Sequence, residues 1–154
     1  MRVLGIDPGT GIVGFGVIDV VGTKKTMVDA GVIRTPAHQP TQERLLTIYN
    51  ELKEIIAQAK PQVMVVEQLF FARNVTTAMS VSQARGVILL LGEQYQLKLA
   101  EFTPLQIKQA ITGYGKADKK QIQEMVRIIL GLKEIPKPDD CADALAAALS
   151  YNAR

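Results

Sequence analysis

Four carboxylates are the residues of this sequence best placed to do chemistry. Asp7 follows a short apolar run near the start of the chain, and Glu67 ends a second apolar run. Asp140 and Asp143 lie three residues apart at the predicted start of the last helix, so both side chains can point to one face of it. Open α/β sheets bind their ligands at the carboxyl ends of strands. We therefore expect the four acids to meet at one site.

Taken singly, each acid also has an ordinary structural interpretation. The Asp-Pro-Gly sequence that begins at Asp7 is a common turn, and a glutamate such as Glu67 often ends a strand where the chain meets solvent. Acids in the first turn of a helix are favoured by the helix macrodipole, and Asp139 is a natural N-cap. The hypothesis of a shared site rests on the combination of the four.

The remaining reactive side chains narrow the chemistry of such a site. The chain has one histidine, His38, and one cysteine, Cys141, which are too few for the histidine and cysteine clusters of zinc sites. A metal bound here must be a hard ion held by carboxylate oxygens, and the acids suit two Mg²⁺ ions. Two such ions activate water and stabilise a leaving oxygen, which predicts hydrolysis of a nucleic-acid phosphodiester.

A sheet with helices packed on it is needed to position these acids. Hydrophobic spacing predicts three leading strands and then alternating helices and strands, with a turn at 22–25 and a loop at 35–42. The predicted strands are about 2–6, 12–20, 26–33, 63–67 and 98–102, and the predicted helices are about 45–56, 74–94, 104–111, 119–130 and 140–151. This order predicts an α/β fold with an antiparallel hairpin region on one edge, parallel strands in the middle and helices on both faces.

Gly14 and Gly16 interrupt the second predicted strand. Glycines inside a strand are typical of positions where another backbone approaches closely. We therefore expect a neighbouring element to pack tightly there.

Length and composition predict one domain, 1–154, because 154 residues with 47% hydrophobic content can build a core of their own. Apolar runs such as 87–91 are far shorter than the roughly 18 residues that a membrane span requires, and the start of the chain lacks the pattern of a signal peptide. We expect a soluble, cytoplasmic protein. The formal net charge of +3 is compatible with a polyanionic partner without requiring one.

The motifs around these acids resemble, in order and spacing, those of the RuvC family of Holliday-junction resolvases. They are Gly-Ile-Asp-Pro-Gly-Thr, Val-Glu-Gln-Leu-Phe-Phe-Ala-Arg-Asn, Gln-Ala-Arg-Gly and Asp-Cys-Ala-Asp-Ala-Leu-Ala, and together they extend over essentially the whole chain. The resemblance implies an RNase H-like fold with a central mixed five-stranded sheet. It also implies a structure-selective endonuclease that makes paired, symmetric cuts in four-way DNA junctions during recombination and repair. The family's catalytic and metal-binding carboxylates fall on Asp7, Glu67, Asp140 and Asp143, with two Mg²⁺ ions that Mn²⁺ can replace.

The resemblance also implies a set of DNA contacts. The family's aromatic residue that reaches into the unstacked junction falls on Phe70, and a displaced base recovers about 1–3 kcal/mol by stacking on a ring. We expect Arg73 and Asn74, in the same segment, to contact DNA as well.

A cluster of lysines surrounds a predicted link between two helices. The resemblance assigns phosphate contact to Lys108 and Lys119, and we expect Lys116 and Lys120 to bind DNA beside them. Lys119 and Lys120 stand at a predicted helix start, where positive charge opposes the macrodipole, so a bound phosphate would explain them. Solvated surface lysines are the ordinary alternative.

The partners implied are four-way junction DNA, a second copy of the chain, and a branch-migration motor of the RuvA/RuvB type. A junction with near two-fold symmetry needs two matching cuts, which predicts a C2 homodimer. The segment at 74–86 is rich in small residues that permit close helix approach, and the resemblance implies that this helix helps to form the dimer seam, although internal packing would use the same residues.

Three other functions fit part of this pattern. An ATPase of the actin and heat-shock-chaperone type has a similar first loop but needs two such domains. A non-catalytic binding module would gain nothing from a negative cluster near DNA phosphates. A related nuclease acting on RNA, of the YqgF-like branch, is disfavoured by the motifs at 67–74 and 140–146, although substrate choice cannot be measured from sequence.

Overall fold

The computed structural model describes residues 1–9, 11–68 and 75–151, in which three strands are followed by alternating helices and strands and then by two more helices. The strands are β1 (Arg2–Asp7), β2 (Ile12–Val21), β3 (Lys24–Arg34), β4 (Val63–Glu67) and β5 (Lys98–Phe102). The helices are α1 (Thr41–Ala59), α2 (Val75–Gln94), α3 (Pro104–Thr112), α4 (Lys119–Leu130) and α5 (Asp139–Ser150).

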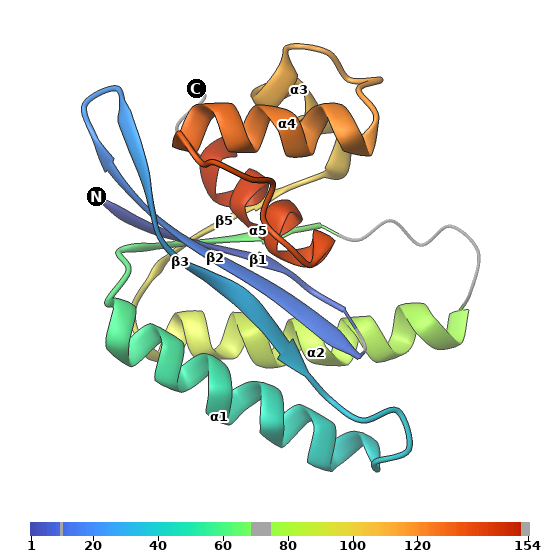
Figure 1. The fold of residues 1–154 in the computed structure, drawn as a ribbon. Helices are drawn as coiled ribbons and strands as arrows, with labels where there is room; N and C mark the ends of the chain where they lie inside the picture. The colour runs from blue at the N-terminus through green and yellow to red at the C-terminus, as the bar shows by residue number, and fades with distance from the viewer. Residues whose placement is uncertain (10, 69–74, 152–154) are drawn as a thin grey trace.

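The five strands form one mixed sheet in the order β3-β2-β1-β4-β5. The strands β1, β2 and β3 are antiparallel neighbours, whereas β4 runs parallel to both β1 and β5. Helices α1 and α2 lie on one face of the sheet, and α3, α4 and α5 lie on the other (Figure 1). The predicted α/β architecture, with a mixed five-stranded sheet and helices on both faces, is confirmed.

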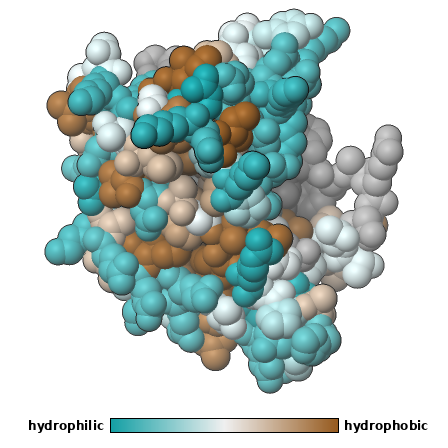
Figure 2. All heavy atoms as spheres, in the orientation of Figure 1, coloured by the Kyte–Doolittle hydropathy of each residue, from teal (hydrophilic) through white to brown (hydrophobic). Residues whose placement is uncertain are grey.

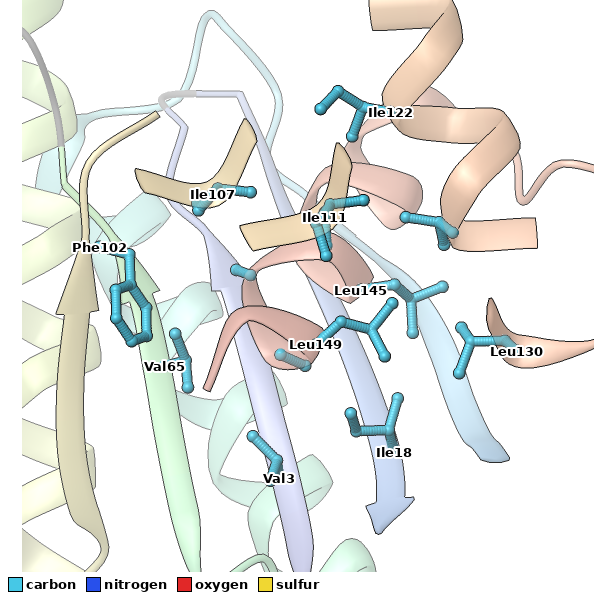
Figure 3. Packing of buried hydrophobic residues seen from close by; sticks show 14 of the residues in the cluster. Val3, Ile18, Val65, Phe102, Ile107, Ile111, Ile122, Leu130, Leu145 and Leu149 are labelled. Atoms are coloured by element: carbon cyan, nitrogen blue, oxygen red, sulfur yellow. The ribbon is translucent and has the colours of Figure 1, made fainter. Parts of the chain in front are cut away.

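The sheet separates two hydrophobic cores. Along β4, Val63 and Val65 pack into the core beneath α3, α4 and α5, whereas Met64 and Val66 pack into the core that faces α1 and α2. Figure 3 shows the first of these cores, with side chains of α5 lying over the strands. A strand that is buried on both faces has a continuous apolar sequence, which is why Glu67 at its end stands out.

Figure 2 shows hydrophilic residues over much of the outer surface, with hydrophobic residues in the band between the upper and lower helices.

Glycines of β1 and β2 allow helix α5 to pack closely against the sheet. Gly5 and Gly16 are register partners in β1 and β2, and both face α5. A Cβ atom at Gly14 would stand 2.1 Å from the carbonyl oxygen of Asp140, so no side chain fits between β2 and the first turn of this helix. The expectation of a close backbone approach in the second strand is confirmed.

Two predicted boundaries were wrong. Helix α1 begins at Thr41, whereas we expected loop through residue 42 and a helix from 45, because its first turn is polar and the hydrophobic spacing starts one turn later. The turn between β2 and β3 comprises only Gly22 and Thr23, since Gly22 adopts a positive φ of 60° that lets the strands continue to Lys24.

Helix α2 is long and apolar enough to cross a membrane by length and composition alone. In the described fold its buried residues, which include Ala84, Ile88 and Leu91, pack in the core shared with α1. The expectation of a protein outside the membrane stays a prediction.

Candidate functional site

Asp7 and Glu67 lie side by side at one edge of the sheet. They are the last residues of β1 and β4, which are parallel neighbours paired through Ile6 and Val66 one residue earlier. Their side chains are hydrogen-bonded to each other, and both are half-buried. The sheet topology thus brings together two acids that are 60 positions apart in the sequence. This agrees with the prediction that acids at the ends of strands meet at one edge of the sheet.

The first turn of α5 adds the other two acids to this edge. Gly14 is the register partner of Asp7, and its lack of a side chain lets the Asp140 backbone rest against β2. Asp140 and Asp143 then lie close enough to Asp7 for both of their charges to raise its pKa. The four carboxylates predicted to meet therefore do gather at the junction of β1, β4 and α5.

Burial and mutual repulsion make this cluster hard to ionise. Burial, followed by the charges of Glu67 and Asp143, raises the pKa of Asp7 to about 9. Burial also raises the pKa of Glu67 and that of Asp143 above their ordinary values. The hydrogen bond between the two side chains raises the pKa of Asp7 and lowers that of Glu67, so Asp7 is the member of the pair that holds a proton more strongly.

Two lysines supply positive charge beside the acids. The Nζ of Lys119 lies 3.3 Å from Asp139 Oδ2 and 3.7 Å from Asp143 Oδ2. Burial opposes the charge of Lys119, but the neighbouring carboxylates outweigh this effect and raise its pKa. The charge of Lys108, on α3, favours the ionised form of Glu67 and so opposes the effect of burial on the pKa of that residue.

A pocket of about 280 Å³ opens between these charged groups. Glu67, Asp143, Lys108 and Lys119 all line it. The rest of its wall is largely apolar and comes from Pro104, Ile107, Ala117, Asp118, Ile122 and Ala146. The site therefore presents acids and lysines together at the mouth of a hollow, an arrangement that can receive a phosphate beside bound cations.

The other two lysines predicted to contact DNA do not line this pocket. Lys116 and Lys120 are exposed, and Lys120 lines a separate groove beside Tyr114. Phe70, Arg73 and Asn74 fall outside the described residues, and their roles stay predictions.

The prediction of Asp139 as the N-cap of α5 was wrong. Pro138 holds the cap position and Asp139 is the first helical residue. Its carboxylate is turned away from the backbone, because it pairs with Lys119 and accepts a hydrogen bond of 3.0 Å from Gln123 Nε2.

Sequence reasoning missed a polar network on the opposite face of the sheet. Arg85 of α2 forms an ion pair with Glu101 of β5, and Gln68 Nε2 donates to the same carboxylate over 3.2 Å. The sequence signal that could have revealed this network is the presence of a charged residue, Arg85, in the apolar helix α2 and of another, Glu101, in the short strand β5.

The donor set of the cluster suits a hard divalent cation. It offers only carboxylate oxygens, and the raised pKa of Asp7 marks a site that is short of positive charge. Within 1–9, 11–68 and 75–151, no three acid, histidine or cysteine side chains are already drawn together as a metal cage.

Comparisons with known proteins agree on one family. The family model described as crossover junction endodeoxyribonuclease RuvC matches residues 3–151. The enzyme of that name from Desulfitobacterium hafniense (strain DSM 10664 / DCB-2) is 57% identical over 151 residues, which cover 98% of this chain and 92% of the relative. The structure of Thermus thermophilus RuvC superposes with a TM-score of 0.93 at 37% identity, covering 99% of this chain and 94% of the other. T. thermophilus RuvC in complex with Holliday junction substrate superposes with a TM-score of 0.91 at 35% identity, again covering 99% and 94%.

Proposed function

The chain belongs to the RuvC family of crossover junction endodeoxyribonucleases, and from this premise we propose that it resolves four-way DNA junctions at the acidic cluster described above. Its fold is the RNase H-like α/β fold of these resolvases. The proposed catalytic residues are Asp7, Glu67, Asp140 and Asp143. The observation that carries the assignment is the convergence of these acids at the ends of β1 and β4, with the pKa of Asp7 raised to about 9.

We propose that the four acids hold two Mg²⁺ ions, which Mn²⁺ can replace. When bound, such ions supply the positive charge that activates water and stabilises the leaving oxygen of a phosphodiester. The task of the protein is to hold the ligands in place. Asp7 and Glu67 are fixed by paired strands, and Asp140 and Asp143 are fixed by the seating of α5 on Gly14. Binding must also displace the proton that Asp7 holds.

Lys119 and Lys108 are proposed to bind the phosphates that flank the cut. In the free protein Lys119 is occupied by Asp139 and Asp143, and its side chain is 58% exposed. Metal binding would neutralise Asp143 and so weaken one of the two ion pairs that hold Lys119. Such contacts contribute salt-dependent affinity without sequence preference. We propose weaker contacts of the same kind for Lys116 and Lys120, and base stacking for Phe70 with help from Arg73 and Asn74.

We propose that two copies of the chain pair through α2. Its exposed residues Val75, Met79, Ser82, Gly86 and Leu90 recur every three or four positions and so form one stripe. A Cβ atom added at Gly86 would meet nothing within 4 Å, so no contact within the described chain requires glycine there. Glycine inside a helix costs about 0.5–1 kcal/mol relative to alanine, and close approach of a second helix would explain its presence.

A homodimer matches the substrate, because two cuts of like polarity need two sites related by a two-fold axis. The proposal also includes a soluble protein in the cytoplasm that works with a branch-migration motor of the RuvA/RuvB type.

The test uses the purified protein with a synthetic four-way junction and a linear duplex of the same sequence. With Mg²⁺ we expect paired, symmetric nicks in the junction and none in the duplex, and with excess chelator we expect no cleavage. In Ca²⁺ the junction should be bound but not cut, since the longer and looser coordination of Ca²⁺ does not reproduce the geometry of the smaller ion. Undiminished cleavage in chelator would refute the proposed chemistry.

A further inference from the structure

We propose that Arg85 is a positioning residue for Glu67, acting from the opposite face of the sheet through Glu101 and Gln68. This inference rests on the proposed function, because it assigns Arg85 a part in forming the metal site. The three residues come from α2, from β5 and from the position directly after β4.

The three side chains form a connected chain of contacts that ends next to Glu67. An Arg85 Nη2 group forms an ion pair with Glu101 Oε1, and Gln68 Nε2 donates to the other oxygen of that carboxylate over 3.2 Å. The backbone N–H of Gln68 donates to the carbonyl of Phe102 over 2.8 Å, which extends the β4–β5 pairing by one residue. Gln68 is therefore held by both its backbone and its side chain.

Strand geometry places this network beneath the catalytic edge. Glu67 is paired with Phe102, which lies in the core under α3 and α5, whereas Val66 is paired with Glu101 and lies in the core toward α2. Successive residues of a strand point to opposite faces. Glu67 consequently points to the acidic cluster, and the anchoring of Gln68 to the far face holds Glu67 in that orientation.

The burial of Arg85 explains why the network is firmly placed. Its side chain is only 16% exposed, and its Nη1 is buried with no acceptor within 1–9, 11–68 and 75–151. A buried charge is costly unless it is paired, so the Arg85 guanidinium requires the Glu101 carboxylate in one position. Gln68 is itself exposed and contributes little to either core. The hydrogen bond from Gln68 to Glu101 therefore serves to orient the end of β4.

The closing experiment measures metal binding directly rather than cleavage. Mn²⁺ affinity is determined by calorimetry for the wild-type protein and for Arg85→Met, Gln68→Ala and Arg2→Met. The last is a matched control, because Arg2 forms an ion pair of 2.8 Å with Asp19 on the same sheet but at the opposite end of β1. Hydrogen exchange of the Gln68 amide in metal-free protein reports whether the strand end has loosened.

We expect Arg85→Met to weaken Mn²⁺ binding roughly 10–100-fold, the usual loss when a residue that orients a metal ligand is removed. Exchange at Gln68 should accelerate as well. Gln68→Ala should shift the affinity in the same direction by less, and Arg2→Met should leave it unchanged.

A folded Arg85→Met protein with wild-type Mn²⁺ affinity overturns the inference. If Arg85→Met does not fold, Gln68→Ala decides the question, because an exposed residue can be truncated without loss of the core, and wild-type affinity there also overturns it. A wild-type protein that binds no Mn²⁺ overturns the proposed function together with this inference. Normal wild-type binding with unchanged variants overturns the inference alone.

Discussion

Replacing Gly14 by alanine should disable the site without touching any acid. The added Cβ would stand 2.1 Å from the carbonyl oxygen of Asp140 and 3.1 Å from the Cβ of that residue. Carbon and other heavy atoms prefer about 3.5–4.0 Å, so the first turn of α5 must retreat by roughly 1 Å or more. A misplacement of about 1 Å can cost about 10²-fold in rate, and we expect a loss of that order in single-turnover cleavage of a four-way junction.

The matched control is Gly16→Ala, two residues along the same strand and facing the same helix. There the added Cβ would meet the side chain of Leu145 at 2.7 Å, further along α5 and away from the acids. Overpacking costs typically 1–3 kcal/mol, and both variants should lose stability of this order in denaturant unfolding. Only Gly14→Ala should also require more Mg²⁺ for half-maximal cleavage. Equal losses of rate with unchanged Mg²⁺ dependence in both variants would refute the positioning of Asp140 by Gly14.

Three further predictions address protonation, junction reading and assembly. The pKa of Asp7 is raised to about 9 in the folded, metal-free protein but returns to its ordinary value of 3.8 when the chain unfolds, so the free energy of unfolding in chelator should fall as pH rises from about 5 to 9. Each extra proton that the folded cluster holds contributes at most about 1.4 kcal/mol per pH unit to this slope. Asp7→Asn should make the slope shallower, and stability that rises over this range in the wild type would contradict the assignment. Phe70→Ala should slow cleavage of an intact junction more than that of a junction loosened by mismatches at the crossover, and equal losses would contradict the stacking role of Phe70. Ser82→Arg, in the exposed stripe of α2, should yield folded monomers in sedimentation with impaired paired cutting, whereas dimers that cut normally would place the seam elsewhere.

The sequence was most informative where a single residue departed from the regular pattern of its strand. Glu67 could be predicted as a site residue because it ends a strand that is apolar on both faces, and Gly14 because glycine is unfavourable within a strand unless something approaches it. Both features depend on local rules, and in the structure Glu67 is the last residue of β4 and Gly14 lies against the backbone of Asp140.

Other features depend on contacts that no local rule contains. The pairing of Arg85 with Glu101 requires α2 to cross beneath β5, and 16 residues separate the two in the chain. Asp139 fits the preferences of an N-cap, but the charge of Lys119 and the amide of Gln123 draw its carboxylate outward. Tertiary contacts of this kind overrule local preference, so sequence reasoning misplaced the cap and missed the network.

The comparison of Asp140→Asn with Asp139→Asn tests the central claim most directly. The two residues are adjacent in the first turn of α5, and each substitution removes one negative charge, but only Asp140 is assigned to the metal site. In single-turnover assays with Mg²⁺ and a four-way junction, we predict that Asp140→Asn binds the junction and does not cut it, while Asp139→Asn cuts within a few-fold of the wild-type rate. Wild-type cleavage by Asp140→Asn, or equal loss in both variants, would contradict the assignment of the acidic cluster as the catalytic centre.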